Sequence, residues 1–550
     1  MEGVKVKRCG LCSKFHTLGC PSETTESVRE KAYYQNGNSE PLNPNCFELD
    51  LERTDLISLF SKIVLENFTV KHLVKGDSSL GLFKWENGRF AECEEFLKAF
   101  VERAGEELGL QDRVRTHVVN ETIEKVKRLT YFELEEEPLK IAFKNYAFDW
   151  KVFLNGPEEP AEEPSYLTPI EATKEEPIFH LIPHNLNVDY FKEGLAHFDI
   201  EKGVIPFVEE MLPDIVKIFK DWVGDKWPLL FEIIGYCLYP DYPFNKAFML
   251  VGSGSNGKTT FLNLINVILG EGNTVSISLQ DICLYRFAPC ELYHKLANIF
   301  SDLPAKPIGY TGFFKVLTGQ DVLSAPRKFR DSIRFRNYAK LIFSANELPE
   351  VSDMSDAFWR RWIVIEFPNK FPDNPTFFEE NFTEEVIEKI IVAGILAFAN
   401  VYKNRKFSVE AGPTDFKEQW LRMANSVYAY VQEGLETKRL SLSGEAYTPS
   451  DELYQDYVSW CRDNDLEAQT KNMFTRELER LFKIVKRRRM EGGQRFYAYE
   501  GVALKTEEEA DLQSFYSCEK CGGKATTRLF RDGREVWLCG SCLKEWEGNL

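Results

Sequence analysis

The chain has 550 residues, 43% of them hydrophobic and 28% charged, and its formal net charge is −18 at pH 7. This length predicts about three or four domains, and the composition is that of a globular, soluble protein. No apolar run approaches the ~18 residues that a membrane-spanning helix needs, and the N-terminus lacks an apolar signal core, so we expect a cytoplasmic protein in its host cell. The negative charge taken alone argues against a nucleic-acid partner, although local basic clusters decide such binding.

Composition and motif order divide the chain into five predicted domains. They are an N-terminal zinc-binding module at 1–48, a mixed region at 50–204, a nucleotide-binding core at 205–402, a third domain at 410–505 and a C-terminal zinc ribbon at 515–550. Helices are expected at 54–66, at 93–108 and within 205–240, where Trp222 and Trp227 are core candidates. The Pro- and Glu-rich segment 155–177 is expected to be a solvated loop.

The C-terminal cysteines form two Cys-x2-Cys pairs with seventeen residues between them. In an intracellular chain such spacing favours zinc over disulfides. Four thiolates complete a tetrahedral Zn²⁺ site, and the intervening strands resemble a zinc ribbon. The predicted ligands are Cys518, Cys521, Cys539 and Cys542.

The N-terminal cysteines are less regular. Cys9 and Cys12 form one knuckle, whereas Cys20 and Cys46 follow at uneven spacing. His16 is a rival ligand for the same ion. We expect a second Zn²⁺ here, with the choice between His16 and a cysteine left open.

Residues 252–259 match the phosphate-binding pattern G-x-x-x-x-G-K-[ST]. A short apolar strand is predicted before them at 247–251 and a helix after them at 259–269, which is the context this motif requires. Backbone N–H groups and the helix N-terminus would face the phosphates of ATP, Lys258 would reach the β- and γ-phosphates, and the Thr259 hydroxyl would bind Mg²⁺. The predicted nucleotide-binding residues are Gly252, Ser253, Gly254, Ser255, Asn256, Gly257, Lys258, Thr259 and Thr260.

Three further features of an ATPase follow in order along the chain. An apolar segment at 296–302 ends in Asp302, placed for the Mg²⁺ shell, and a second at 339–346 ends in Asn346, placed to orient water or contact the γ-phosphate. Arg360 and Arg361 then precede another apolar run, and either could be an arginine finger. The alternative interpretations are a loop Asp and a surface Arg pair.

The order and spacing of these motifs resemble those of superfamily 3 helicases, in particular the phage, plasmid and poxvirus-type primase-helicases. Residues 314–329 are similar to that family's extra motif, a β-hairpin that projects into a central channel. The likeness covers roughly 50–505 and is strongest over 229–367. It implies an α/β AAA+-type parallel-sheet ATPase core with a helical N-terminal region, working as a hexameric ring. Relatives often carry two acids where this chain has Ser301 and Asp302, which leaves the catalytic base open.

Two basic clusters suit DNA. Around the expected hairpin, five cations against Asp331 give a local charge of about +4, and Lys328 near its tip is the first choice for a phosphate contact. A second hairpin is expected at 485–499, joined at Gly492-Gly493 and preceded by a helix at 472–482, which suggests a winged-helix domain. A solvated charged hairpin is the alternative. The predicted DNA-binding residues are Arg327, Lys328, Arg330, Lys486, Arg487, Arg488, Arg489 and Arg495.

Together these features predict an ATP-dependent DNA helicase that acts in replication of a virus, phage or plasmid. The expected assembly is a homohexamer on single-stranded and forked DNA. Only about fifty residues precede the helical region, so a primase would be a separate chain. The alternatives are an origin-binding or loader ATPase without processive unwinding, and a zinc-bearing ATPase that remodels protein assemblies.

Overall fold

The structure is a computed structural model that describes residues 55–505, apart from 77, 157–163, 198–204, 305, 307, 329, 350, 352, 354, 410–412 and 492–493, together with 527–531 and 534–538. Two compact units emerge. Unit 1 contains the chain to residue 303 with 308–346 and 353–410, and unit 2 contains 304–307, 347–352 and the chain from 411 onward. All eight cysteines of the two predicted zinc groups, and His16, lie outside the described residues.

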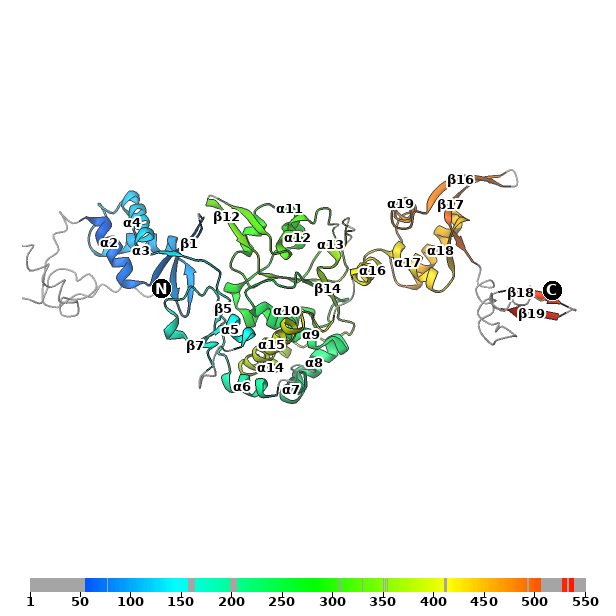
Figure 1. Ribbon diagram of the computed structural model, residues 1–550. Coiled ribbons are helices and arrows are strands. Elements are labelled where there is room, and N and C mark those ends of the chain that lie inside the picture. The colour runs from blue at the N-terminus through cyan, green and yellow to red at the C-terminus, as the bar shows by residue number, and fades with distance from the viewer. Residues whose placement is uncertain are drawn as a thin grey trace, which may run out of the picture. The chain divides into compact units, whose positions relative to one another are not determined.

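A small α/β region begins unit 1 (Figure 1). It holds helices α2 (Leu56–Asn67), α3 (Glu94–Glu107) and α4 (Thr116–Leu129), which confirm the helices expected at 54–66 and 93–108. The sheet beside them has the order β3-β2-β1-β4. Its strands are β1 (Val70–Lys75), β2 (Ser78–Glu86), β3 (Arg89–Glu92) and β4 (Tyr131–Glu133). The apolar faces of the three helices meet in one buried cluster that includes Phe60, Leu97 and Val126.

A three-stranded sheet connects this region to the rest of unit 1. Its strands are β5 (Lys140–Ala142), β6 (Tyr146–Asp149) and β7 (Leu167–Pro169), followed by the 3₁₀ helix η1 (Ile170–Thr173). Helix α5 (Trp150–Asn155) begins with a fully buried tryptophan whose Nε1 donates to the carbonyl oxygen of Leu238 at 3.0 Å. That bond joins the connecting sheet to a helical layer.

The helical layer supports the central sheet. It comprises α6 (Val188–Ala196), α7 (Ile205–Met211), α8 (Pro213–Val223), η2 (Gly224–Lys226), α9 (Pro228–Leu238), α14 (Phe377–Asn381) and α15 (Glu384–Asn404), so the helical prediction for 205–240 is confirmed. Helices α9 and α15 pack backbone against backbone. They are so close that a Cβ on Gly235 would lie 1.9 Å from the carbonyl oxygen of Gly394. Only glycine permits that approach.

The central sheet of unit 1 is entirely parallel, with the order β14-β8-β13-β10-β9. Its strands are β8 (Ala247–Val251), β9 (Thr274–Val275), β10 (Ala297–Phe300), β13 (Lys340–Ala345) and β14 (Trp362–Glu366). β8 and β13 are buried at every position, as the continuous apolar runs of a sheet covered on both faces require. The predicted α/β parallel-sheet core in a multidomain chain is therefore confirmed.

The connections between these strands carry the remaining elements of unit 1. They are α10 (Lys258–Leu269), η3 (Glu271–Asn273), α11 (Leu279–Leu284), η4 (Ala288–Leu292), α12 (Gly312–Thr318) and α13 (Asp356–Trp359). Strands β11 (Val322–Arg327) and β12 (Arg330–Arg336) pair antiparallel as a separate two-stranded hairpin. The hairpin expected from residues 314–329 is thus confirmed, although helix α12 occupies the first part of that range.

Unit 2 has the element order helix, helix, strand, helix, helix, strand, strand. These are α16 (Pro413–Ala424), α17 (Ser426–Glu436), β15 (Leu440–Pro449), α18 (Ser450–Asp463), α19 (Lys471–Phe482), β16 (Val485–Glu491) and β17 (Gln494–Leu504). The strands form an antiparallel sheet in the order β15-β17-β16, over a core that includes Tyr430, Leu453 and Phe474. Both the helix expected at 472–482 and the following hairpin are confirmed. Farther on, β18 (Thr527–Arg531) and β19 (Arg534–Leu538) also pair antiparallel.

The described residues contain no helix that is both long enough and apolar enough to cross a bilayer.

Candidate nucleotide site and nucleic-acid interface

The predicted phosphate loop joins the carboxyl end of β8 to the start of α10. Its glycines are required by conformation and space. Gly254 and Gly257 have φ of +95° and +91°, values that side chains with a Cβ rarely adopt. A Cβ on Gly257 would also lie 2.5 Å from Nε1 of Trp222, and one on Gly252 would lie 2.0 Å from Nδ2 of Asn256. The loop is therefore held in one shape by its neighbours.

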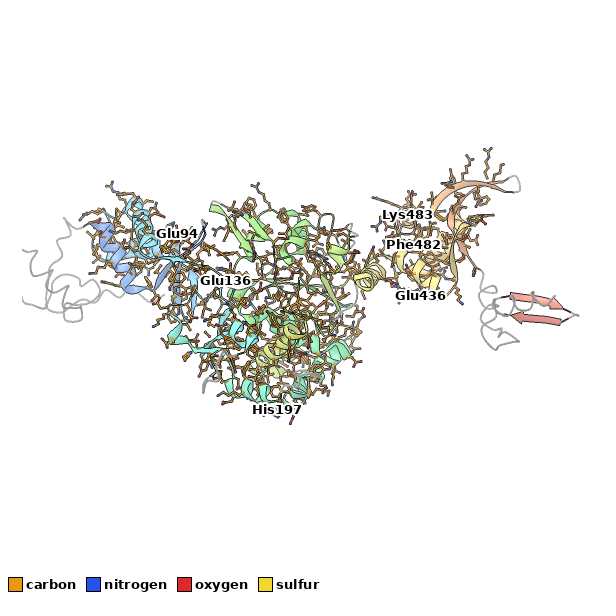
Figure 2. All side chains as sticks on the ribbon, in the orientation of Figure 1. Glu94, Glu136, His197, Glu436, Phe482 and Lys483 are labelled. Carbon is orange, nitrogen blue, oxygen red and sulfur yellow. The ribbon has the colours of Figure 1, made fainter. Side chains whose placement is uncertain are left out.

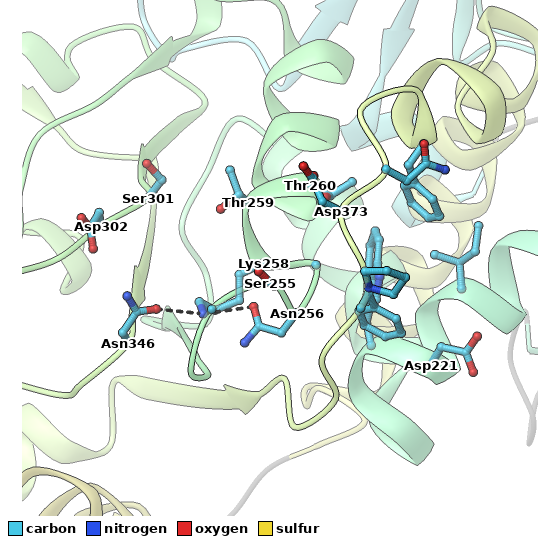
Figure 3. Close-up of a pocket in the computed structure, with 18 residues that line it drawn as sticks. Asp221, Ser255, Asn256, Lys258, Thr259, Thr260, Ser301, Asp302, Asn346 and Asp373 are labelled. Carbon is cyan, nitrogen blue, oxygen red and sulfur yellow. Dashed lines mark hydrogen bonds between the residues drawn. The ribbon is translucent and has the colours of Figure 1, made fainter.

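Lys258 is buried beneath this loop (Figure 3). Its Nζ donates to the carbonyl oxygen of Gly252 at 2.6 Å, to Oδ1 of Asn256 at 3.1 Å and to Oδ1 of Asn346 at 3.3 Å. Burial lowers the pKa of the Lys258 ammonium, and the charge of Asp302 partly offsets that effect. An ammonium held by neutral oxygens near one carboxylate is well placed to exchange these partners for phosphate oxygens.

Asp302 and Asn346 lie at the carboxyl ends of neighbouring parallel strands. Asp302 follows β10, Asn346 follows β13, and both line one cavity of about 690 Å³ together with Lys258 and Thr259. A hydrogen bond from Oγ of Ser344 to the carbonyl oxygen of Ser301, 2.5 Å long, fixes the two strand ends relative to each other. The sheet thus brings together residues that are far apart in the sequence.

The oxygens around this cavity fit Mg²⁺. The Thr259 hydroxyl and the exposed Asp302 carboxylate are hard oxygen donors, and Mg²⁺ in nucleotide sites binds one or two such groups along with phosphates and water. No cluster of three or more His, Cys, Asp or Glu side chains within the described residues could hold a metal by itself. The zinc predictions concern residues that the structure does not describe.

The two arginines of the predicted finger pair differ sharply in environment. Arg361 is 8% exposed, and its guanidinium donates to Oγ1 of Thr318 at 2.8 Å, to the carbonyl oxygen of Lys315 at 3.4 Å and to that of Ala357. Burial lowers its pKa. Arg360 is exposed. Arg361 is therefore committed to the interior of unit 1, and Arg360 is the one whose side chain is open to a partner.

Arg361 also anchors the base of the β11–β12 hairpin. Thr318 and Lys315 belong to α12, which leads directly into β11. At the other end of the hairpin, Nδ2 of Asn337 donates to the carbonyl oxygen of Leu317 at 3.0 Å. The start of β14, the end of α12 and the end of β12 are thus joined by hydrogen bonds, a link that motif spacing did not predict.

The β11–β12 hairpin has an apolar face and a polar face. Leu323, Ala325, Ile333 and Phe335 are buried. Arg334 and Arg336 alternate with them on β12 and are exposed, and Lys328 is exposed in the turn. Arg327 is half-buried, and Arg330 lies on β12 with its side chain outside the described set. The structure therefore places three of the cluster's cations at the surface, as phosphate contacts require.

Sequence reasoning missed one wall of the nucleotide cavity. It is lined by Asp221 and Trp222 at the end of α8, and by Phe371, Asp373 and Phe377 in the segment after β14 (Figure 3). The backbone N–H of Phe371 donates to the carbonyl oxygen of Ser255 at 2.7 Å, which joins that segment to the phosphate loop. Trp222 was predicted only as a core residue. No motif marks this wall, because its residues come together only through the fold.

The chain matches two described families over part of its length. Residues 250–361 match a family of unknown function (DUF5906), and residues 422–513 match the family described as Poxvirus D5 protein-like. The "Putative helicase L207/L206" of Acanthamoeba polyphaga mimivirus is 27% identical over 176 residues, which are 31% of this chain and 17% of that protein. The "Putative helicase 121R" of Invertebrate iridescent virus 3 is 25% identical over 261 residues, 43% of this chain and 24% of that protein. The chain thus spans a quarter or less of each relative.

Solved structures give more distant likenesses. The apo C-terminal region of NrS-1 covers 80% of this chain and 98% of its own at 14% identity, with a TM-score of 0.36. The JCV helicase bound to a small-molecule ligand covers 46% of this chain and 74% of its own at 14% identity, with a TM-score of 0.24. At TM-scores this low, neither structure supports a conclusion about this chain. The poxvirus D5-like region and the two viral relatives confirm the resemblance to viral primase-helicases of the superfamily 3 type.

Proposed function

We propose that the chain is an ATP-dependent DNA helicase that works as a hexameric ring on single-stranded DNA during replication of a virus, phage or plasmid. One observation carries the proposal. Lys258, Asp302 and Asn346 line a single cavity with the phosphate loop, in the same unit as an exposed basic hairpin. A motor needs such a combination of a triphosphate site and a strand contact. The similarity to viral helicases supports the same class.

The residues divide the work of ATP hydrolysis as follows. The loop N–H groups and Lys258 hold the β- and γ-phosphates, and Lys258 exchanges its contacts with Gly252 and Asn346 for phosphate oxygens. Thr259 and Asp302 would hold Mg²⁺, which neutralises charge on the transferred phosphoryl group. Asn346, released from Lys258, is free to orient the attacking water or contact the γ-phosphate. Because Ser301 stands where relatives often have a second acid, Asp302 serves the metal and water together, or another acid acts as base.

Arg360 completes this site from the neighbouring subunit. Its exposure supports a role in trans, since an arginine finger must leave its own subunit's surface to reach the next nucleotide. Arg361 instead positions α12 through Thr318 and the Lys315 carbonyl. A finger of this type is worth ~10³–10⁵ in rate in related chemistry.

DNA is bound by two surfaces in this proposal. The β11–β12 hairpin contacts the strand inside the ring through Lys328 and its neighbouring arginines. Unit 2 acts as a winged-helix domain, supported by its order of helix, strand, two helices and two strands and by the basic composition of β16. Phosphate contacts of both kinds are independent of sequence and weaken with salt.

Zinc would stabilise the two ends of the chain. The cysteine spacing at 518–521 and 539–542 is that of a closed four-thiolate site, and the β18–β19 hairpin between the pairs is compatible with a zinc ribbon. The group at Cys9, Cys12, Cys20 and Cys46 would hold a second ion. We assign both ions a structural role, since a complete thiolate tetrahedron leaves no position for water.

A second candidate is an origin-binding or loader ATPase that does not unwind processively, favoured by the basic β16–β17 hairpin of a separate unit 2. A third is a zinc-bearing ATPase that remodels protein assemblies. Priming, if it accompanies this activity, would come from a separate primase. DNA-stimulated ATP turnover separates the first two candidates from the third, and strand displacement separates the helicase from the loader.

The test is strand displacement on forked DNA with defined single-stranded tails, with Lys258→Ala as the inactive control. ATP-dependent displacement by the wild-type chain and none by the variant supports the proposal. DNA-stimulated ATP hydrolysis without displacement would favour the loader. ATP hydrolysis that is indifferent to DNA would leave the remodelling ATPase as the better assignment.

A further inference from the structure

The β16–β17 hairpin of unit 2 has two faces of different character. In its register, Lys486 pairs with Tyr499, Arg488 with Tyr497 and Met490 with Arg495, whereas Arg487 pairs with Ala498 and Arg489 with Phe496. Directly opposed residues share a face, and successive residues alternate between faces. The four consecutive basic residues at 486–489 are therefore split between two surfaces.

On one face, two arginines share a single carboxylate. Nε of Arg487 lies 3.5 Å from a carboxylate oxygen of Glu500, and Nη1 of Arg489 lies 3.9 Å from the other. The Arg489 guanidinium also lies over the ring of Tyr447, 4.0 Å from its centroid. Both arginines are thus engaged by one carboxylate, and Arg489 also packs on a ring of β15, so this face has less positive charge to offer a partner. We call this the paired face.

The other face, which we call the open face, carries Lys486, Arg488, Met490, Arg495 and Tyr497. No ion pair joins Arg488 or Arg495 to a carboxylate among the described side chains, and both are exposed. Met490 is 69% exposed and Tyr497 54% exposed. Nζ of Lys486 lies 5.3 Å from the centroid of the Tyr497 ring. The open face thus combines exposed cations with an exposed ring.

Helix α19, which ends at Phe482 and is followed by Lys483 (Figure 2), does not combine exposed cations with an exposed ring in this way. Lys471 forms an ion pair with Asp451, and Arg480 forms one with Glu477 at 2.5 Å. The exposed Arg476 has the exposed Glu479 one turn away on the same helix. Two of the three cations within α19 are therefore paired with carboxylates, whereas the hairpin brings exposed cations and an exposed ring together on one face.

We propose that unit 2 binds single-stranded DNA through the open face of β16–β17, with an unpaired base stacked on Tyr497 and phosphates held by Arg488 and Arg495. The inference deepens the proposed function and rests on it only in taking DNA as the partner. Phosphates alone would need no exposed apolar groups beside the arginines. An aromatic ring among cations is the platform that unpaired bases use, and duplex bases, already stacked on each other, cannot reach it.

The test compares variants of the full chain for binding to a fluorescent single-stranded oligothymidylate and to a duplex of equal length, without nucleotide. Tyr497→Ala is expected to weaken single-strand binding about tenfold, and Tyr497→Phe, which keeps the ring, to stay within about twofold of wild type. Arg488→Ala should lower the slope of log affinity against log salt by about 0.7. The matched control Arg487→Ala removes an arginine from the same strand on the paired face and should change affinity less than Arg488→Ala.

The following outcomes would overturn the inference while DNA binding itself is retained. They are Tyr497→Phe binding as weakly as Tyr497→Ala, Arg487→Ala matching Arg488→Ala, Arg476→Ala on α19 weakening binding more than Arg488→Ala, or an equal loss on duplex and single strand. An unaffected Tyr497→Ala, with wild-type binding and unwinding intact, would reject this site while leaving the proposed helicase standing. A wild-type chain that binds no DNA would reject both.

Discussion

The two basic hairpins of this protein are built differently. β11–β12 in unit 1 alternates buried apolar side chains, such as Leu323 and Phe335, with exposed arginines, and its base is held by Asn337 and, through α12, by Arg361. The outer part of β16–β17 in unit 2, by contrast, has Met490, Arg495 and Tyr497 exposed. The first hairpin is seated on the nucleotide unit, and the second projects from a three-stranded sheet.

The packing of each hairpin limits what that hairpin can do. A hairpin whose apolar face is packed against its own unit moves together with that unit. β11–β12 can therefore follow changes at the strand ends of unit 1 that carry Asp302 and Asn346. The exposed end of β16–β17 is proposed to bind DNA, but it has no comparable apolar packing through which to transmit force. Changes in the first hairpin should therefore alter the coupling between ATP turnover and unwinding, and changes in the second should alter affinity alone.

The largest effect is expected from the loss of ATP hydrolysis, on which the proposed roles of both hairpins in unwinding depend. Lys258→Ala should lower ATP hydrolysis by at least ~10³-fold, because the variant lacks the ammonium that stabilises charge on the transferred phosphoryl group. The melting temperature should stay close to that of wild type, which a thermal melt checks. Turnover near the wild-type rate would show that this loop is not the ATPase site.

Because Arg360 is exposed and Arg361 is buried, their substitutions should have different effects. Arg360→Ala should lower ATP hydrolysis by about 10³-fold without loss of stability, and mixing it with Lys258→Ala subunits should restore part of the activity. Arg361→Ala should instead destabilise unit 1 by about 1–3 kcal/mol, since Thr318 and two carbonyl groups would each lose a hydrogen-bond donor in the interior. If mixed rings form but show no recovery, Arg360 acts within its own subunit.

The coupling role of the first hairpin is tested at its turn. Lys328→Ala should abolish unwinding while DNA-independent ATP hydrolysis stays within about twofold of wild type, because this lysine is proposed to bind phosphates of the strand and does not line the candidate nucleotide cavity. Lys328→Arg, which keeps the charge, should retain unwinding. Tyr497→Ala on the second hairpin should leave unwinding per bound molecule unchanged. Persistent unwinding by Lys328→Ala would remove the assignment of the hairpin.

The pH dependence of stability reports on the sheet beneath the first hairpin. Lys340 on β13 is fully buried, its Nζ donates to the carbonyl oxygen of Tyr239, and burial lowers its pKa from 10.5 to about 7. Between pH 7 and 10.5 the unfolded chain holds a proton that the folded chain has released, so stability rises with pH across that window. Urea unfolding should show unit 1 more stable at pH 9 than at pH 7 by on the order of 2 kcal/mol.

Lys340→Met is the matched comparison, because it fills similar space without a titrating group. This variant should lose that part of the pH dependence and should be more stable than wild type at pH 7, where burial of a charge is costly. If the stability of Lys340→Met and of wild type changes equally between pH 7 and 9, the Lys340 ammonium keeps its ordinary pKa.

The smallest expected effect on the motor comes from the C-terminal cysteines. Cys518→Ser should release one of about two zinc ions per chain, measured by elemental analysis, and leave DNA-independent ATP hydrolysis unchanged. A segment of this length is too short to bury a core of its own, so a bound zinc ion would supply its folding energy. Unchanged zinc content, or loss of basal turnover along with the zinc, would contradict a structural tail that is independent of the motor.

The sequence by itself determined the elements that depend on local pattern. Continuous apolar runs predicted β8, β10 and β13, glycine spacing predicted the phosphate loop before α10, and the Gly-Gly pair predicted the β16–β17 hairpin. These signals are local because burial on both faces of a strand, positive φ and helical periodicity are each encoded within a few residues. The polar residues at the strand ends followed from the same runs.

Only the tertiary structure shows which of two identical neighbouring residues is exposed and which is buried or paired. Arg360 and Arg361 are indistinguishable in the chain, yet one is exposed and the other is buried against α12, because each step through the turn that ends α13 points the side chain in a different direction. In strand β16, the alternation of side chains places Arg487 and Arg488 on opposite faces of their hairpin. Trp222 and Phe371 meet at the nucleotide cavity from segments almost 150 residues apart. Partners that are distant in sequence, and the direction in which a side chain points, are set by packing that no local pattern contains.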